Sequence, residues 1–599
     1  MPDTAFNYYS SNVLNLDSDI KKVRKRIFVF YLARLILFLS VITFFVLYIK
    51  FKSNMLFLFF SFTCLALFLY CVKRNLDLAY HEQLLNHKLQ VNKDELNFLD
   101  HRYHEHDRGD EYNYLNPHLA ADFDIFGNGS LFQYLNRCST RIGKDRFAQN
   151  LCASELNEDI IVKKQQAVME LSGKNELAQN FQAYGKFITE NGSELSNLQA
   201  WLNEEDEKLR LLQISAYIFP IICFTWIALV VFGSFSVNSI IVPIILNLSI
   251  IGLNRKRIGK AHSKLGSSAK TFEKYAKLIK LIEDDDFESS FLSELKHKLT
   301  NRDKKASQSL KVLFNLLNSF DIRLNIIASF FLNSLLLFDI HIYYRLAKWK
   351  KLHQNVVALW FSTLSEFDAL ISYAAYAFNN QDKVVYPKIS DKEFTFQAVE
   401  IGHPLLHPTV RVNNTIHFLG TPSVLIVTGA NMAGKSTFLR TLSVNLMLAM
   451  NGAPVCAKSF EFTPCDIMSS IKIQDSLSNN ESYFYAELLR IRDIIDHVKA
   501  NPRTLVVLDE ILRGTNTKDK QLGSLGLLEK LISQNSVVIV ATHDLVIGEL
   551  ENKYPDIVTN YCFEVELTND QLIFDYKLKK GISQKLNASF LMKKMEIIN

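Results

Sequence analysis

Four long apolar runs stand out from the mixed polar and apolar pattern of the chain. They cover Ile27–Ile49, Met55–Val72, Leu211–Phe232 and Ser239–Leu253, and Arg34 is the one charge inside them. Most of these runs approach the roughly 20 residues that a membrane-spanning helix needs. Short breaks join the runs in pairs. The pattern predicts two helical hairpins in a membrane; the alternative is two pairs of buried helices in a soluble core.

Basic residues flank the outer ends of both hairpins and are sparser in the turns. The clusters are Lys21–Arg26 and Lys73-Arg74 around the first hairpin and Arg255–Arg257 after the second. By the positive-inside rule, both termini and the segment 75–208 face the cytoplasm, and Arg34 can extend its charge toward the basic end. We expect a multi-pass protein in the inner or plasma membrane of a bacterium-like cell, held in lipid by about four transmembrane helices.

A fifth apolar stretch, Leu324–Phe338, is shorter than the other runs. It has about 15 residues and includes two asparagines, so a helix of this length would not cross a bilayer. We expect a core helix here. The surrounding segment 261–380 alternates charged and apolar positions and predicts long helices.

The last third of the chain has the pattern of an α/β domain. Val424–Val427 is an apolar, mostly β-branched run, Gly429-x-x-x-x-Gly434-Lys435-Ser436 follows it, and Thr437–Met450 is apolar at helical spacing. Strand, glycine-rich turn and helix start are the context of a phosphate-binding P-loop, whose backbone N–H groups surround phosphate oxygens. Lys435 would reach the β- and γ-phosphates of ATP, and the Ser436 hydroxyl would ligate Mg²⁺. The alternative is a chance glycine-rich turn before a core helix.

Two further strands end in chemically useful side chains. Thr504–Glu510 is an apolar run that closes with Asp509 and Glu510, and a third strand leads into His543. Asp509 could hold Mg²⁺, and Glu510 could orient and polarise the attacking water. His543 could sense the γ-phosphate. Without a P-loop in the same domain, Asp509 and Glu510 would be interpreted as solvated acids at a strand end, and His543 as an ordinary loop histidine.

Chain length, net charge and the distribution of cysteines and histidines narrow the classes of protein to which the chain can belong. At 599 residues the chain is too long for one core, and its net charge of +5 does not by itself indicate a nucleic-acid binder. Its eight cysteines are scattered without a Cys-x-x-Cys pair, which disfavours a disulfide framework and a zinc site. The histidines at 101, 104 and 106 are interpreted as a solvated helix face rather than a metal site.

Several motifs together resemble one family. Asn431-Met432 lies inside the P-loop, Ser482-Tyr-Phe-Tyr-Ala-Glu487 precedes a helix, Asp509–Thr517 reads Asp-Glu-Ile-Leu-Arg-Gly-Thr-Asn-Thr, and Ala-Thr-His543 closes the third strand. In this order and spacing they resemble the ATPase domain of the MutS family, within the ABC-type ATPases. More weakly, the Gly-Ser-Leu turn near residue 130, the helix around residues 364–370, a His-Pro pair at 403–404 and Gly581–Ala588 resemble the core, last lever helix and flanks of the same family.

The resemblance implies a dimeric ATP hydrolase that uses Mg²⁺. Ser482 of each subunit would complete the ATP site of its neighbour and meet the γ-phosphate, and Arg513–Thr517 would lie at the same interface. The catalytic set would be Lys435, Ser482, Glu510 and His543, with Ser436 and Asp509 on the metal. The nucleotide-binding set would be Gly429, Asn431, Met432, Ala433, Gly434, Lys435, Ser436 and Thr437.

The chain departs from MutS proteins at its N-terminal side. About 120 residues precede the core-like segment, without an apparent mismatch-reading domain or a Phe-x-Glu wedge, and the second hairpin replaces at least part of the clamp region. DNA contact stays open through basic helices at Arg255–Lys264, Lys274–Lys280 or Arg345–Lys351. The two hypotheses are a membrane-anchored ATPase that acts on DNA and, alternatively, a membrane-bound machine whose MutS-type ATPase acts on a protein partner or a transported molecule. A non-enzymatic, ATP-gated scaffold is disfavoured by the complete set of catalytic residues.

The fold class expected is multidomain, α plus α/β. The expected order is a basic tail (1–26), hairpin one (27–75), a helical linker (76–121), a first core-like part (122–210), hairpin two (211–254), lever helices (255–395) and the P-loop ATPase domain (396–599).

Overall fold

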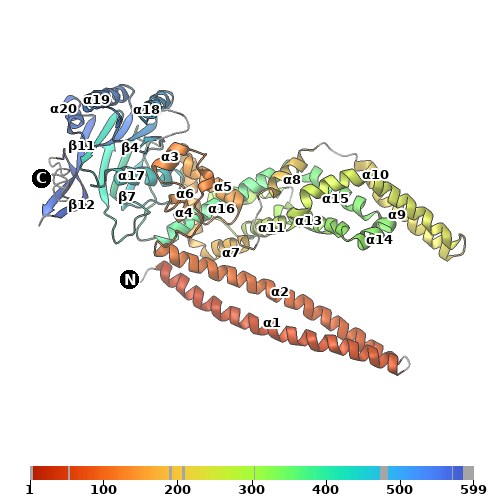
Figure 1. The fold of residues 1–599 in the computed structure, drawn as a ribbon. Helices are drawn as coiled ribbons and strands as arrows, with labels where there is room; N and C mark the ends of the chain where they lie inside the picture. Colours follow the sequence, from red (N-terminus) through yellow and green to blue (C-terminus); the bar gives the residue numbers. More distant parts are fainter. Residues whose placement is uncertain are drawn as a thin grey trace.

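The computed structural model describes residues 4–51, 54–187, 192–204, 209–301, 304–472, 483–568 and 571–583. The molecule is elongated (Figure 1), with an α/β domain at one end, a helical lever beside it, and two helical hairpins that point away from the α/β domain. A helical N-terminal part followed by mixed α/β sheets agrees with the predicted fold class.

The first hairpin consists of two helices, α1 (Thr4–Lys50) and α2 (Met55–Leu99), which pack antiparallel. The side chain of Asn54 caps α2 by accepting a hydrogen bond from the N–H of Leu56. The helices are longer than the predicted hairpin: residues 4–26, expected as a tail, form the first half of α1, and α2 runs far into the expected linker. The reason is that the polar halves carry their own small core, in which Ile20 packs near Leu85.

The distal half of the first hairpin is apolar on its outside. Ile36 and Phe59 expose 63% and 66% of their surfaces. Aromatic contacts set the register of the two helices: the rings of Phe38 and Phe68 lie 6.0 Å apart. In an antiparallel pair, four residues before Phe38 on α1 correspond to four residues after Phe68 on α2. Arg34 therefore lies at about the level of Val72, next to the basic pair Lys73-Arg74 that follows the apolar run of α2.

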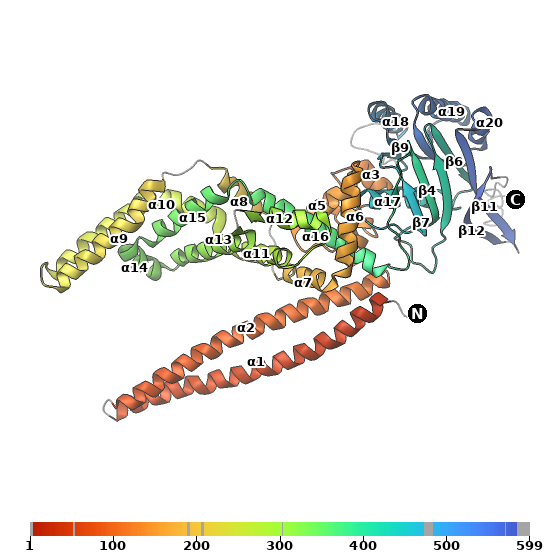
Figure 2. The same ribbon diagram turned by 180° about the vertical axis from the view of Figure 1, so that it is seen from behind.

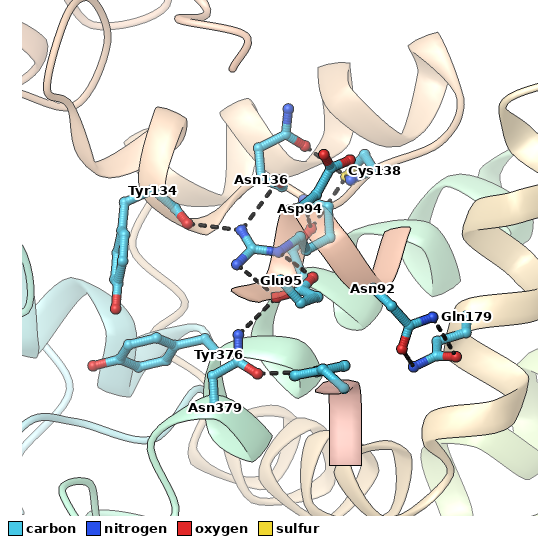
Figure 3. Close-up of polar contacts among 12 residues, drawn as sticks. Asn92, Asp94, Glu95, Tyr134, Asn136, Cys138, Gln179, Tyr376 and Asn379 are labelled. Carbon is cyan, nitrogen blue, oxygen red and sulfur yellow. Dashed lines mark hydrogen bonds and ion pairs between the residues drawn. The ribbon is translucent and has the colours of Figure 1, made fainter. Parts of the chain in front are cut away.

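Figure 3 shows how the root of this hairpin joins the rest of the protein. The guanidinium of Arg137 donates two hydrogen bonds to the carboxylate of Glu95 on α2, at 2.6 and 3.1 Å, and lies 3.3 Å from the ring centroid of Phe98. Asn379 donates to the same carboxylate at 2.7 Å and accepts from the hydroxyl of Tyr9 on α1 at 2.9 Å. Four distant segments of the chain thus meet in one buried polar cluster.

The lever consists of helices on both sides of the second hairpin. The first group is α3 (Pro117–Asp122), α4 (Leu131–Leu135), α5 (Arg141–Cys152), α6 (Glu158–Gly173), α7 (Asn175–Gly185) and α8 (Glu194–Leu202). The second is α11 (Ala269–Asp284), α12 (Ser290–Lys298), α13 (Ala306–Phe320), α14 (Ile326–Leu336), α15 (Phe338–His353) and α16 (Val357–Asn379). The central helix is α16, which is buried along most of its length and leads into the α/β domain. Its Asp368 accepts hydrogen bonds from the hydroxyl and the N–H of Thr140, at 2.7 and 2.9 Å, and so holds α5.

The second hairpin, α9 (Leu209–Val231) and α10 (Ile241–Leu265), leaves the tip of the lever (Figure 1). In the described part of the chain, four helices are long and apolar enough to cross a membrane, namely α1, α2, α9 and the helix that includes α10. A bent pair, α14 and α15, would be a fifth by the same measure, with 80° between its two helices.

The prediction of a core helix at Leu324–Phe338 is wrong. The helix forms as α14, but its large apolar side chains are exposed; Ile326 is 82% exposed. The absence of charges in a sequence predicts that the helix lies in an apolar environment. It does not say whether that environment is the protein core or another apolar medium.

The α/β domain contains a sheet of the order β12-β11-β6-β10-β9-β8 within the described residues. Its strands are β6 (Ser423–Gly429), β8 (Asp466–Ser470), β9 (Thr504–Asp509), β10 (Val537–Thr542), β11 (Val558–Thr568) and β12 (Gln571–Lys580). All neighbours pair parallel except β11 and β12. Alternate residues of β6 enter two different apolar clusters, one with helix α17 (Lys435–Met450), the other with α18 (Tyr483–Ala500) and α19 (Thr517–Ser533). The sheet is therefore covered on both faces, as its unbroken apolar strands require.

A smaller sheet of order β3-β7-β4-β5 lies beside the large one, and its strand β5 contacts β6 and β12. Its strands are β3 (Lys388–Ile389), β4 (Thr395–Ile401), β5 (Asn414–Leu419) and β7 (Ser459–Phe462). Short elements complete the described fold: the strand pair β1 (Thr300–Asn301) and β2 (Lys304–Lys305), and helix α20 (Leu550–Lys553).

The buried Glu95–Arg137 pair gives a stability prediction. Glu95→Gln leaves a guanidinium buried without its counter-charge, so we expect the free energy of unfolding to fall by about 3 kcal/mol or more. The matched control is Glu82→Gln on the same helix, because Glu82 pairs with Arg24 at 2.6 Å where the arginine side chain is 62% exposed; we expect a change of about 1 kcal/mol or less. Urea denaturation of the full chain in detergent, followed by tryptophan fluorescence, measures both. Equal effects of the two substitutions would contradict this account.

Candidate nucleotide-binding site

The site forms where β6 ends and α17 begins. The connecting loop turns through residues with positive φ, which are Gly429 (153°), Met432 (69°) and Gly434 (101°). A side chain at Gly429 would place its Cβ 2.8 Å from the carbonyl oxygen of Phe563, so the loop needs glycine at the sheet edge. The loop thus brings backbone N–H groups and the N-terminus of α17 to one place, which suits phosphate binding.

Lys435 is the cation of this loop. Its side chain is buried, and the ammonium donates to the carbonyl oxygens of Gly429 and Ala430 at 2.8 and 3.0 Å. It also lies 3.9 Å from a carboxylate oxygen of Glu510. Burial lowers the pKa of Lys435, and the two neighbouring carboxylates oppose that shift. An anionic group in the loop would keep this ammonium charged.

Ser436 and Asp509 form the second part of the site. The Ser436 hydroxyl donates to Asp509 Oδ2 at 2.5 Å, which links the P-loop helix to the end of β9. Asp509 is buried, burial raises the pKa of its carboxyl group, and its Oδ1 has no hydrogen-bond partner among the residues described. A hydroxyl and an unpartnered carboxylate oxygen are oxygen ligands of the kind that Mg²⁺ prefers. The residues present therefore fit the predicted magnesium ion.

The carboxylate of Glu510 lies close to the other ionisable side chains of the site. It has a φ of 49°, a left-handed conformation that is uncommon for a residue other than glycine and is typical of functional sites. Its carboxylate lies 3.4 Å from Nδ1 of His543 after β10 and 3.4 Å from Nε of Arg513. Its N–H donates to the carbonyl oxygen of Ala541 at 2.9 Å, which holds the turn against β10. Because β6, β9 and β10 are parallel neighbours, the three predicted strand ends meet at one edge.

A cavity of about 430 Å³ opens at this edge. The P-loop residues and Glu510 line one part of it. Another part of the wall is apolar and aromatic, and its members include Leu406, Val410, Val412, Phe563 and Tyr576. Asn414 holds two segments of this wall together, because its amide donates to the Tyr576 carbonyl oxygen and accepts from the N–H of Leu578. A polar anion-binding end beside an apolar wall matches a nucleotide with its phosphates in the loop and its base on the wall.

Sequence reasoning missed this wall. Its residues come from the segment 401–414 and from β11–β12, and they share no motif; the His-Pro pair at 403–404 was the one signal near them. His403 also lines the cavity, and burial lowers its pKa to about 4, so that its imidazole stays neutral near pH 7.

The structure brings together Lys435, Ser436, Asp509, Glu510 and His543, and their catalytic and metal-binding roles stay predictions. Within the loop, Ala433 is buried, whereas Asn431, Met432 and Thr437 are exposed at its rim. Ser482 lies outside the residues that the structure describes, so its role stays a prediction. Glu487 of the same motif is buried and accepts from the N–H of Leu512 at 2.6 Å, which holds α18 against the turn after Glu510.

Fold and site together define a P-loop protein with a mostly parallel α/β core. Comparison with known proteins specifies the class further. The family model described as MutS domain V matches residues 425–596. The chain is 31% identical to MutS protein homolog 4 of Mus musculus over 235 residues, which are 38% of this chain and 24% of that protein.

A second relative is the DNA mismatch repair protein MutS of Chlorobium chlorochromatii, with 33% identity over 228 residues, 36% of this chain and 25% of that protein. The chain therefore spans about a quarter of the length of the curated relatives it matches. These matches support the MutS family, and they do so through the ATPase-containing C-terminal region.

The magnesium ligands give a test. Ser436→Ala removes the hydroxyl, and we expect the affinity for ATP in the presence of Mg²⁺ to fall by about tenfold or more, because a lost interaction with a charged group is worth about 1.5 kcal/mol or more. Binding without Mg²⁺ should change little. Titration with a fluorescent ATP analogue, with and without Mg²⁺, measures both affinities. The control is Ser443→Ala, further along the same helix, whose hydroxyl donates to the Leu439 carbonyl oxygen. Unchanged MgATP affinity in Ser436→Ala would contradict the assignment.

Proposed function

We propose that this protein is a MutS-type ATPase that hydrolyses ATP with Mg²⁺, that it is anchored in a membrane by its two helical hairpins, and that it acts on DNA. The observation that carries the ATPase proposal is the meeting of Lys435, the Ser436–Asp509 pair and Glu510 at one sheet edge. The lysine and the serine come from the start of α17, and the two carboxylates come from the end of β9 and the residue after it, yet the polar atoms of each lie within 4 Å of a neighbour.

The residues divide the reaction among them. Lys435 exchanges its bonds to loop carbonyls for bonds to the β- and γ-phosphates, and so stabilises the charge that develops on transfer. Ser436 and Asp509 would hold a Mg²⁺ ion, which would supply positive charge against the phosphates. Glu510 orients the attacking water and accepts its proton, and His543, 3.4 Å from that carboxylate, holds Glu510 in place and faces the γ-phosphate.

The site is completed by a second copy of the chain. In a homodimer, Ser482 of the partner subunit donates to the γ-phosphate, and the exposed loop Arg513–Thr517 lies at the interface. Arg513 supports this arrangement, because its side chain is 41% exposed while its Nε already contacts Glu510.

Membrane anchoring rests on the two hairpins. Their apolar side chains face outward in the described structure, which is unfavourable in water and favourable in lipid. Both hairpins point away from the α/β domain, the first alongside the lever and the second from its tip (Figure 1 and Figure 2), so that one bilayer can take both. Arg34 lies level with the basic pair Lys73-Arg74, which sets one boundary of the hydrocarbon region. The α/β domain and both termini then face the cytoplasm of a bacterium-like cell.

DNA is the first candidate partner because one relative is named a DNA mismatch repair protein. A specific observation favours the second candidate, a membrane-bound machine acting on a protein partner or a transported molecule. Several of the cations proposed for DNA contact are engaged within the protein. Lys260 and Lys264 both pair with Glu204, at 2.9 and 2.7 Å, and Lys277 pairs with Glu273 at 2.7 Å. Lys274 and Lys350 are buried and donate to backbone carbonyl oxygens.

Glu510→Gln tests the hydrolysis proposal. The amide cannot accept the proton of the attacking water, so we expect turnover of the full chain in lipid nanodiscs to fall by about 100-fold or more, with ATP affinity retained. The control is Glu529→Gln, an acid of α19 that pairs with Lys553 far from the cavity. Turnover of Glu510→Gln equal to that of the control would overturn the assignment.

The same nanodiscs separate the two candidate partners. Homoduplex, mismatched and branched DNA are added at fixed salt, and stimulation of ATP hydrolysis by any of them supports the DNA-directed function. Turnover that no DNA changes supports the membrane machine instead. Stimulation that falls steeply with salt identifies backbone phosphate contacts as the source.

A further inference from the structure

The helix α14 reverses the usual distribution of polar and apolar side chains. Between Arg323 and Asp339 the sequence carries no charge. Asn333 and Ser334 of α14 are buried. Ile326, Ile327, Phe330 and Phe331 are exposed, Ile327 by 72% and Phe331 by 59%. Polar side chains inside and large apolar ones outside indicate a surface made for a neighbour other than water.

The second hairpin holds the polar side of α14. The helix packs against both α9 and α10, and Asn247 of α10, itself buried, donates to the carbonyl oxygen of Ser334 at 2.8 Å. Around this contact α10 exposes apolar side chains of its own, among them Ile245 and Leu246. The outward face of α14 therefore continues the apolar surface of the hairpin.

Both ends of α14 are fixed to the lever. Arg323 and Asp339 lie 3.7 Å apart and close the base of the apolar segment. Leu337 has a φ of 50° and turns the chain by 80° into α15. The helix α15 packs its apolar side against α13 and α9 and carries exposed Arg345, Lys348 and Lys351, so the pair α14–α15 is no spanning segment. With 11 residues, α14 alone is about 16 Å long, half of what a bilayer core requires.

We propose that α14 is an interfacial membrane helix: it lies in the boundary between headgroups and acyl chains, beside the apolar part of α10, and buries Ile326, Ile327, Phe330 and Phe331 in lipid. The proposal rests on the proposed membrane anchoring and adds a contact to it. The lever tip is then held at the bilayer by a spanning or tilted hairpin and by a helix packed against that hairpin, and the two contacts fix the tilt of the tip as well as its depth.

Photocrosslinking in lipid tests this contact and the anchoring separately. The full chain is reconstituted in vesicles of phosphatidylcholine with a minor fraction of phosphatidylglycerol. The photoreactive residue p-benzoylphenylalanine replaces one side chain at a time, at Phe330 on α14, at Phe59 on α2 as the anchoring position, and at Leu522 on α19 as the control. Leu522 is an exposed apolar residue of the α/β domain. Mass spectrometry identifies the adducts after irradiation.

We expect phospholipid adducts at Phe59 and Phe330 and none at Leu522. Lipid adducts at Phe59 but not at Phe330 would overturn the interfacial helix and leave the anchoring intact. An adduct from Phe330 to a second copy of the chain would overturn it as well, because α14 would then be a protein interface. The absence of lipid adducts at both Phe59 and Phe330 would overturn the membrane anchoring itself, and the interfacial helix with it.

A charged substitution provides the second measurement. Phe330→Glu lies on the exposed face, so it should leave folding and ATP turnover as they are. Quenching of tryptophan fluorescence by lipids brominated at different depths reports the depth of the second hairpin, since Trp226 lies near the end of α9 that leads into the turn. We expect Phe330→Glu to shift the depth of maximal quenching relative to the wild type, whereas Leu522→Glu should not; an identical depth profile for all three proteins would overturn the proposal.

Discussion

The arrangement of the molecule depends on the buried ion pair between Glu95 and Arg137. Two charges out of water are tolerated only where each is fully matched, and here the guanidinium has a bidentate carboxylate, backbone carbonyls and an aromatic face. The pair joins the root of the first hairpin to the segment after α4, and Asn379 adds the last turn of α16. Separating them would leave a buried charge unmatched, so this contact opposes any separation of the first hairpin from the lever base.

The same base contacts the nucleotide-binding domain through acidic residues of the lever. Asp122 at the end of α3 accepts hydrogen bonds from the N–H groups of Ile471 and Lys472, directly after β8. Arg440 of the P-loop helix donates to the Asp122 carbonyl oxygen and pairs with Asp124 at 3.0 Å. The P-loop helix therefore contacts the lever directly. The lever in turn contacts the root of the first hairpin through the buried cluster around Glu95 and Arg137.

What could be predicted from the sequence was local. The P-loop, the strand ends carrying Asp509 and Glu510, and the long apolar helices each lie within one short stretch whose spacing reports its structure. The apolar wall of the cavity could not be predicted, because Val412 and Tyr576 come together only through contacts between segments far apart in the sequence, such as those of Asn414. The length of α1 was missed because its mostly polar first half resembles a tail, although a few apolar residues there, such as Ile20, form a small core with α2. The error at α14 has another cause: Phe330 and Phe331 predict that water is excluded, and composition alone does not say by what.

We propose two properties for the same molecule: ATP turnover at the P-loop and residence in a bilayer. Flotation of the full-length protein with phospholipid vesicles through a density gradient, with ATP hydrolysis assayed in every fraction, measures both at once. We expect the activity to float with the vesicles, to remain with them after an alkaline wash and neutralisation, and to be absent from the same fraction of Glu510→Gln. Activity that stays at the bottom of the gradient, or is released by the wash, would contradict the proposal.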